Sequence, residues 1–268
     1  MKKWLTAFAV LSMSSAPALA QEWNHDPASP NGPLVWGDVA FKFATCGSAV
    51  RGPVGQTQSP IDITTATALA ADLPSPRFLY GSTPFVIENT GHVVEVPYEG
   101  GRAQLVLGSG PFDVYELAQL HFHTDSEHAV DGKLTEMEVH LVHRNALGNL
   151  AVVGVLLQVG SNPNPLIEEI FANAPLRAEA SVTLPGRVLN ARDLLPRDTG
   201  SFWTYSGSLT TPPCSESVRW TVLKRTVNVS ARTVARFRQI VAAFPGYEGF
   251  ARNNRPFVEP GTRPILSR

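Results

Sequence analysis

Short segments in which apolar and polar residues alternate recur along the chain, and glycine or proline separates them. A period of two residues is typical of a strand with one buried face, and the Gly/Pro positions between segments predict turns. The pattern predicts a β-rich chain, with strands at residues 85–87, 92–96, 103–107, 116–123, 136–143, 151–159 and 218–223.

Only two segments have the spacing of helices. Residues 166–174 follow two prolines, and residues 231–244 follow Ser230, whose hydroxyl can cap a helix N-terminus. Four apolar residues share one face of the second segment: Val234, Phe237, Val241 and Phe244. Because no repeat, linker or charge block interrupts the chain, we predict a single domain.

The N-terminus has the features of a secretory signal. Residues 1–20 run from Lys2 and Lys3 through an apolar stretch to small residues ending at Ala20. That stretch is too short to span a bilayer as a stable helix, and no later segment is long and apolar enough. We expect cleavage near Ala20 and a soluble, periplasmic or secreted domain of residues 21–268 with no membrane span.

The composition of the exported part limits its partners and its compartment. Without Lys2 and Lys3 it has 20 basic and 23 acidic residues, a net charge of minus three. This balance offers no basic surface for nucleic acid or membrane, so we expect a small-molecule partner. Cys46 and Cys214 are the only cysteines, and export places them where disulfides persist. We predict one disulfide; the alternative is two unrelated buried thiols.

Histidines are concentrated in one stretch, QLHFHTDSEH, which contains three of the seven in the chain. If residues 116–123 form a strand, its side chains alternate between the two faces of the sheet. His121 and His123 then point to the same face, which also carries Gln119.

A second predicted strand brings a third imidazole to this place. In residues 136–143 the same alternation puts Glu138 and His140 on one face. If the strands pair antiparallel with His121 opposite His140, then His123 lies opposite Glu138, and three imidazoles converge.

Three neutral imidazoles that leave a fourth position open suit a catalytic zinc ion. Gln119 and Glu138 stand where they can hold the far ring nitrogens and fix the tautomers. The alternative is that these are polar positions on half-buried strands. Three imidazoles would also bind cobalt or copper, so zinc is a preference rather than a unique solution.

Six motifs resemble the α-class carbonic anhydrases of the bacterial exported type, and they span nearly the whole chain after residue 20. They are GQTQSPIDI (55–63), NTGHVVEV (89–96), QLHFHTDSEHAVDG (119–132), EMEVHLVH (136–143), YSGSLTTPPC (205–214) and NNRP (253–256). The resemblance implies a mainly β single domain, built around a large, mostly antiparallel twisted central sheet with a few short peripheral helices.

The resemblance also assigns roles. The residues that match the zinc ligands are His121, His123 and His140, and those that match the groups orienting them are Gln119, Glu138 and Asn253. Thr210 matches the hydroxyl that accepts a hydrogen bond from zinc-bound hydroxide, and Glu127 matches the carboxylate to which this hydroxyl donates. An ionised carboxylate only accepts, so the threonine must turn its proton away from the metal.

The implied reaction is the reversible hydration of carbon dioxide to bicarbonate and a proton by attack of zinc-bound hydroxide. The residues that match the substrate pocket are Val142, Val152, Leu209, Thr211 and Trp220; the alternative for the apolar ones is ordinary core packing. His92 matches the proton shuttle, for which we expect an exposed imidazole with a pKa near 6.5. The alternative for His92 is an ordinary surface histidine.

Three positions depart from the family pattern. His25 stands where the family usually has a tyrosine, and Thr90 and Glu95 stand where many relatives have asparagines. These departures bear on proton transfer rather than on the metal.

Other matches are structural. His128 and His143 match buried, hydrogen-bonded imidazoles outside the site. Ser59-Pro60 and Pro212-Pro213 match cis prolines. We expect the disulfide to tie the loop that carries Thr210 to the N-terminal region.

The alternatives are a non-catalytic binding module, a zinc esterase and a structural exported β-protein. The complete histidine set, Glu127 and Thr210 argue against the first and third. The sequence has neither an H-E-x-x-H nor a G-x-S-x-G motif that would make hydrolysis primary. It leaves open whether the protein is a monomer or a homodimer.

Overall fold

The computed structural model describes residues 22–48, 57–99 and 102–268. The predicted signal, residues 1–20, lies outside the described residues. Among the helices in the described ranges, none has the length and apolar character needed to cross a membrane.

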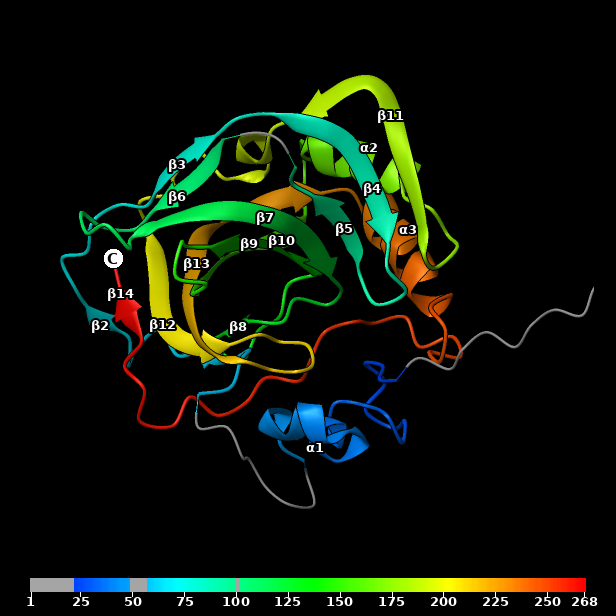
Figure 1. Cartoon of the computed structure of the whole chain (residues 1–268), viewed down its shortest axis with the longest axis horizontal. Coiled ribbons are helices and arrows are strands. Elements are labelled where there is room, and N and C mark those ends of the chain that lie inside the picture. Colours follow the sequence, from blue (N-terminus) through cyan, green and yellow to red (C-terminus); the bar gives the residue numbers. More distant parts are fainter. Residues whose placement is uncertain (1–21, 49–56, 100–101) are drawn as a thin grey trace, which may run out of the picture.

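One large twisted sheet dominates the described part of the chain (Figure 1). Its strands are β2 (Leu69–Ala70), β3 (Arg77–Tyr80), β4 (Thr83–Asn89), β5 (Val94–Pro97), β6 (Ala103–Val106), β7 (Val114–His123), β9 (Met137–Arg144), β10 (Leu150–Val159), β11 (Ala180–Leu189), β12 (Phe202–Ser208), β13 (Glu216–Val229) and β14 (Leu266–Ser267). The main path runs β11-β4-β5-β7-β9-β10-β13-β12-β14-β2, and β6 joins β3 to β7. Only β10–β13 and β14–β2 pair parallel within this sheet. The predicted mainly β, mostly antiparallel architecture is confirmed.

Two short strands pair outside the large sheet. They are β1 (Asp62–Ile63) and β8 (Ala129–Val130), which run parallel. All the segments predicted as strands are present, but β5 begins only at Val94, so His92 lies in the preceding turn. Gly91 has a φ of 82° there, which ends the extended backbone one residue before His92.

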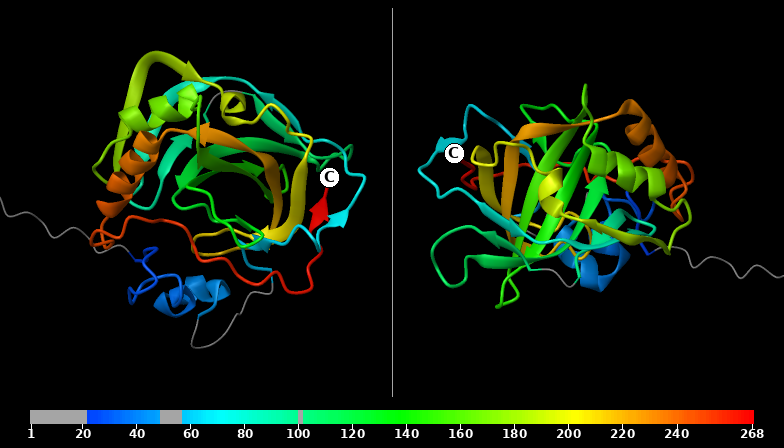
Figure 2. Two further views of the ribbon diagram at one scale, coloured as in Figure 1. Left: turned by 180° about the vertical axis from the view of Figure 1, so that it is seen from behind. Right: turned by 90° about the horizontal axis from the view of Figure 1, so that it is seen from above.

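The helices lie at the periphery (Figure 2). They are α1 (Trp36–Val39), α2 (Pro165–Asn173) and α3 (Ala231–Ala242), with the 3-10 helices η1 (Phe41–Cys46) and η2 (Ala191–Leu194). The two predicted helices are confirmed as α2 and α3. The Ser230 hydroxyl caps α3 by accepting from the Thr233 backbone N–H at 3.0 Å.

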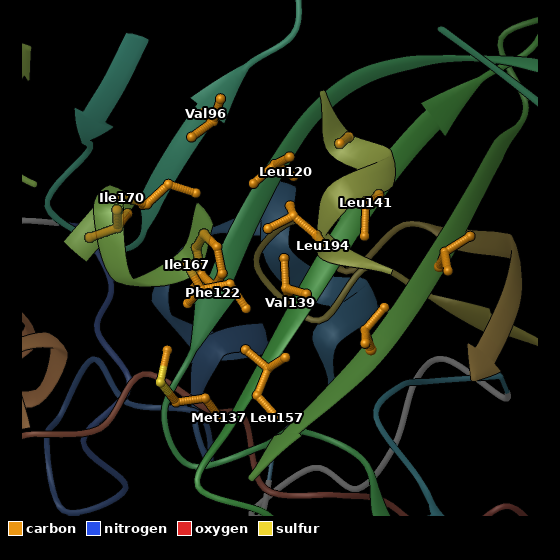
Figure 3. Packing of buried hydrophobic residues seen from close by; sticks show 14 of the residues in the cluster. Val96, Leu120, Phe122, Met137, Val139, Leu141, Leu157, Ile167, Ile170 and Leu194 are labelled. Carbon is orange, nitrogen blue, oxygen red and sulfur yellow. The ribbon is translucent and has the colours of Figure 1, made fainter. Parts of the chain in front are cut away.

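The two faces of β7 and β9 serve different purposes. Leu120, Phe122, Val139 and Leu141 point into the main apolar core, where they pack with Ile167 of α2 (Figure 3). Full burial of one such side chain stabilises the fold by about 1.5–3 kcal/mol. Keeping these apolar residues in the core therefore determines which residues of β7 and β9 lie on the opposite face. Because side chains alternate, both histidines of β7 and His140 of β9 face the opposite side.

Candidate metal centre

Three imidazoles meet across the β7–β9 pair. The strands run antiparallel with His121 opposite His140 and His123 opposite Glu138, which confirms the register predicted from the sequence. One ligand nitrogen from each histidine lies within 4.8 Å of those of the other two. His123 and His140 are buried, whereas His121 is half-buried.

A hydrogen-bond acceptor holds the far nitrogen of each ring. Nδ1 of His121 donates to Oε1 of Gln119 at 2.8 Å, and Nε2 of His140 donates to Oε1 of Glu138 at 3.0 Å. Nδ1 of His123 donates to the backbone carbonyl of Asn253 at 2.8 Å. Each ring therefore carries its proton away from the centre and turns a lone pair inward.

Asn253 acts through its backbone and through its side chain. The Nδ2 atom donates to the carbonyls of His92 and Phe122 at 3.1 and 3.0 Å, and Oδ1 accepts from the Thr124 N–H at 2.8 Å. These bonds fix the carbonyl that orients His123.

The three rings are uncharged near neutral pH. Burial lowers the pKa of His123 to about 4. Burial and the neighbouring imidazoles lower the pKa of His121 well below its usual value, and burial lowers that of His140 although Glu138 opposes the shift. Neutral imidazole is the form that binds a metal ion.

The donor set fits zinc. Nε2 of His123 is buried and has no hydrogen-bond partner among the described residues, which is costly unless the lone pair is used. Three imidazole nitrogens, each fixed by an outer acceptor, form the usual protein part of a catalytic zinc site.

A buried network supports Glu138. Its Oε1 also accepts from Nδ1 of His128 at 2.8 Å, and Nε2 of His128 is 2.7 Å from the Tyr205 hydroxyl. This hydroxyl lies 2.9 Å from Oγ of Ser59. His128 is thus a buried, hydrogen-bonded imidazole, as predicted; so is His143, whose Nε2 is 2.6 Å from the Tyr80 hydroxyl.

Glu127 and Thr210 are both buried beside the rings. Oε2 of Glu127 lies 3.5 Å from Nε2 of His123 and 3.8 Å from Nδ1 of His140, and Oε1 accepts from the Arg255 backbone N–H at 2.7 Å. Burial raises the pKa of Glu127 to about 7, while His140, the Arg255 N–H and the Thr210 hydroxyl lower it. The structure therefore brings Glu127, Thr210 and two of the predicted ligands together.

The predicted apolar wall belongs to a second cluster, separate from the main core. Val152 and Trp220 are buried in it, and Val142 and Leu209 pack against it. The Trp220 ring lies 4.9 Å from that of His140, centroid to centroid. Thr211 is half-buried on the loop after β12.

His92 does not have the exposed surroundings predicted for it. Its ring is half-buried and stacks on Trp23, with centroids 3.7 Å apart and planes 4° apart. Burial lowers the pKa of His92 to about 4. The expectation of an imidazole that titrates near pH 6.5 is therefore wrong, because the N-terminal segment covers the ring.

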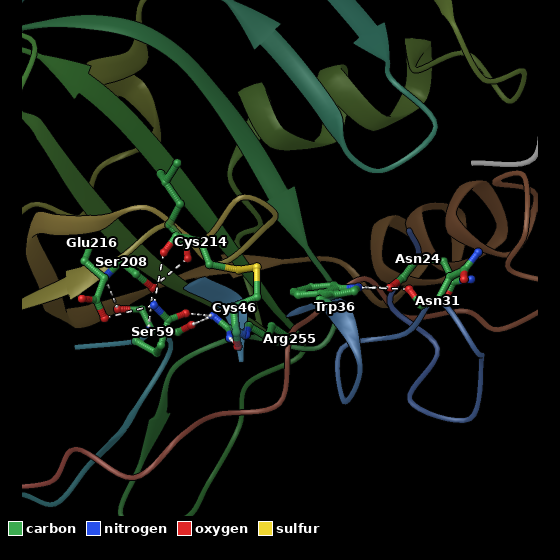
Figure 4. Close-up of a disulfide and its surroundings, with 11 residues drawn as sticks. Asn24, Asn31, Trp36, Cys46, Ser59, Ser208, Cys214, Glu216 and Arg255 are labelled. Carbon is green, nitrogen blue, oxygen red and sulfur yellow. Dashed lines mark hydrogen bonds between the residues drawn. A yellow bond between two sulfur atoms is a disulfide. The ribbon is translucent and has the colours of Figure 1, made fainter. Parts of the chain in front are cut away.

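The Cys46–Cys214 disulfide is present and joins residues 168 apart in sequence (Figure 4). The Arg255 guanidinium reinforces the junction by donating to the Cys46 carbonyl at 2.9 Å and to the Ser59 carbonyl at 2.8 Å. Ser59-Pro60 and Pro212-Pro213 are both cis, as predicted, and Thr124-Asp125 is also cis. The loop that carries Thr210 is thus tied to the N-terminal segment.

Two parts of the site were not predicted. Arg255 holds Glu127, and the only sequence signal was its place in the NNRP motif. His25, identified only as a departure from the family pattern, is buried, and its ring centroid is 6.4 Å from that of His123. Burial lowers the pKa of His25 well below its usual value, and Arg255 and the protonated forms of His123 and His92 would lower it further by repulsion.

Comparison with known proteins gives a consistent result. The sequence model of the eukaryotic-type carbonic anhydrases matches residues 31–268. A carbonic anhydrase of Nostoc sp. is 37% identical over 252 residues, covering 93% of this chain and 87% of that protein. One of Klebsiella pneumoniae is 35% identical over 256 residues, covering 95% and 94%.

A solved structure agrees with the sequence matches. The α-carbonic anhydrase of Thermovibrio ammonificans, in complex with the inhibitor sulfanilamide, superposes with a TM-score of 0.80 at 34% identity. The match covers 93% of this chain and 100% of that one. The chain belongs to the eukaryotic-type, or α-class, carbonic anhydrase family, and is an enzyme of that family.

Proposed function

We propose that the protein catalyses the zinc-dependent, reversible hydration of carbon dioxide to bicarbonate and a proton. The observation that carries the proposal is the convergence of His121, His123 and His140, each with its far nitrogen held by an acceptor. When bound, zinc supplies a Lewis acid that lets water ionise near neutral pH, and its charge favours the ionised form of nearby carboxyl groups.

The Thr210–Glu127 pair orients the reacting group. The carboxylate of Glu127 only accepts when it is ionised, so the Thr210 hydroxyl donates to it and turns a lone pair toward the cavity. That lone pair accepts only from a group that still carries a proton. The Arg255 backbone N–H at 2.7 Å keeps the carboxylate in place.

Carbon dioxide is held against the second apolar cluster. Val142 is half-buried, lies across the β9–β10 pair from Val152, and is two residues from His140 on the same face. Together with Leu209 and Trp220 it provides an apolar surface for a small uncharged substrate next to the metal ligands. Thr211 completes this pocket on the side of the loop after β12.

His92 is proposed as the residue that passes the proton to solvent. Its partial exposure supports this role, and its lowered pKa makes it a weak proton acceptor while it stacks on Trp23. Replacing His92 with alanine is expected to slow steady-state hydration in weak buffer, with recovery on addition of imidazole. An unchanged rate in weak buffer would remove His92 from the pathway.

The remaining proposals concern location and assembly. Residues 1–20 form a signal cleaved near Ala20, and residues 21–268 form the catalytic domain, which acts in the periplasm or outside the cell on carbon dioxide and bicarbonate. The disulfide supports export, because such bonds persist in oxidising compartments. The active protein is a monomer or a homodimer.

Stopped-flow hydration and ester hydrolysis, measured on the same metal-analysed protein before and after chelation, test the function. We expect chelator-sensitive hydration as the main activity, and replacing Thr210 with valine to lower kcat/KM about a hundredfold. A zinc-loaded protein without hydration would be a binding module. Ester hydrolysis with no hydration would make it a zinc esterase.

A further inference from the structure

Glu95 is a carboxylate on the metal-binding face of the sheet that the proposed function does not use. Its neighbours in β5, Val94 and Val96, are buried in the main core, so Glu95 points to the other side of the sheet. Across the β5–β7 pair, Glu95 lies directly opposite His121. Residues directly opposite each other in an antiparallel pair share a face, with Cβ atoms about 4.5–5.5 Å apart. Glu95 therefore lies on the face where the three imidazoles meet.

A second carboxylate continues this row away from the imidazoles (Figure 1). Glu88 of β4 lies directly opposite Glu95, so the row consists of Glu88, Glu95, His121 and His140 across β4, β5, β7 and β9. Neighbouring strands are about 4.8 Å apart, so Glu88 is one strand spacing further from the imidazoles than Glu95. The two residues carry the same kind of charge on the same face at two different distances from the metal centre.

No partner neutralises the Glu95 carboxylate. It is half-buried, and none of the described residues donates a hydrogen bond to it or forms an ion pair with it. Burial and the charge of Glu88 raise its pKa to about 7. Partial burial of a carboxylate without a donor costs stability, so a contribution to the fold does not explain this residue. Its charge, when it is ionised, acts instead on ligands at the metal centre.

The sign of this charge distinguishes the two ligands of the proposed reaction. Carbon dioxide has no net charge, whereas bicarbonate is an anion and is repelled by an ionised carboxylate. For two charges about two strand spacings apart, roughly 9 Å, an effective dielectric constant between about 80 and 20 changes an affinity about twofold to twentyfold. Glu95 can therefore favour the neutral substrate over the anionic product without contacting either one.

We propose that the charge of Glu95 disfavours anions at the metal centre and so favours carbon dioxide over bicarbonate, which makes Glu95 a specificity-determining residue. The proposal rests on the proposed function, because it takes the substrate and the product of that reaction as the ligands.

Ligand binding to the cobalt(II)-loaded protein tests the proposal, since three imidazoles bind cobalt and its visible spectrum reports ligands that enter the site. Thiocyanate, an anion, and imidazole, which is uncharged at about pH 8.5, are titrated into each protein at that pH and at low ionic strength. Hydroxide competes with both ligands and is itself an anion. The ratio of the thiocyanate Kd to the imidazole Kd cancels this competition and isolates the charge of Glu95.

The ratio should fall about threefold to tenfold in Glu95→Gln, because thiocyanate is no longer repelled and imidazole has no charge to be repelled. Glu95→Asp keeps the charge, so its ratio should stay within about twofold of the wild type. Glu88→Gln is the matched control, because it removes an equal charge one strand spacing further away, and its ratio should fall by less than that of Glu95→Gln. Glu95→Asn provides a second uncharged variant, with the same expected fall, if Glu95→Gln does not fold.

Three results would overturn the inference: an unchanged ratio in the uncharged variants, an equal fall in Glu95→Asp, which would assign the effect to side-chain shape, or a fall in Glu88→Gln as large as that in Glu95→Gln. Cobalt uptake and carbon dioxide hydration, measured on the same wild type, separate the two proposals. A wild type with neither property contradicts the proposed function, whereas an active, cobalt-binding wild type whose ratio does not depend on Glu95 contradicts only this inference.

Discussion

Replacing Glu138 by glutamine tests how the rings are held. The carboxylate accepts four hydrogen bonds: Oε1 from the rings of His128 and His140, and Oε2 from the backbone N–H groups of Glu127 and His128 at 2.9 and 2.8 Å. An amide of the same shape has only one oxygen, so its NH₂ group must face one of these pairs of donors. Backbone N–H groups cannot become acceptors, whereas an imidazole can change tautomer. The NH₂ group therefore turns toward the rings.

The Glu138→Gln substitution should therefore weaken metal binding. With an NH₂ group at its Nε2, His140 places its proton on Nδ1, the nitrogen that it must offer to the metal. To bind zinc, His140 must return to the tautomer with its proton on Nε2. That proton no longer has the Glu138 carboxylate as its acceptor, so a hydrogen bond to a charged group is lost. Such a bond contributes about 1.5–3 kcal/mol, so the zinc Kd should rise about tenfold to a hundredfold.

Competition with a chelator of known zinc affinity measures this effect. Glu136→Gln is the matched control, because Oε2 of Glu136 accepts from the Val159 backbone N–H at 3.1 Å and takes no part in holding the rings. We expect wild-type zinc affinity for Glu136→Gln and weakened affinity for Glu138→Gln. Equal affinity in Glu138→Gln and the wild type would refute the reasoning that Glu138 sets the tautomer of His140.

Three further predictions follow from single features. Replacing Cys46 and Cys214 with alanine should lower the free energy of unfolding by about 5 kcal/mol, because the bridge joins residues 168 apart in sequence. The Tm in calorimetry should fall by about 10 °C or more, and a shift below about 2 °C would contradict this. Gly154→Ala would place its Cβ 2.7 Å from Oε1 of Glu138, so chelator competition should show weaker zinc binding, and unchanged affinity would show that the carboxylate can move away freely. Burial lowers the pKa of His143 from 6.5 to about 3. Between these pH values the unfolded chain binds a proton at His143 and the folded chain does not, so the free energy of unfolding decreases as pH falls below 6.5. Urea unfolding between pH 6 and pH 4 measures this effect. The free energy of unfolding should fall less steeply with decreasing pH in His143→Gln than in the wild type, by up to about 1.4 kcal/mol per pH unit. Equal slopes in the two proteins would exclude the effect.

The convergence of the three histidines could be predicted from the sequence because their placement depends on local rules. Alternation along β7 puts His121 and His123 on one face, and the neighbouring apolar residues, Leu120 and Phe122, point into the core. Antiparallel pairing with β9 then leaves a single register that brings His140 to them. Thr210 was identified only from the family motifs, because it lies in a loop, where the sequence has no alternation of apolar and polar residues.

The surroundings of the ligands depend on contacts between distant parts of the chain. His92 is covered by Trp23, and His25 is oriented by Tyr247, 222 positions further along. Neither contact leaves a periodic signal in the sequence. The strand β11 was also not predicted, because most of its side chains are exposed and a proline and a glycine interrupt it.

Zinc titration of the metal-stripped protein, followed by stopped-flow carbon dioxide hydration, tests the central claim most directly. Activity should be absent at the start, rise in proportion to added zinc and level off at one ion per chain. Full activity in the metal-stripped protein, or no activity with one zinc ion bound to each chain, would contradict the account.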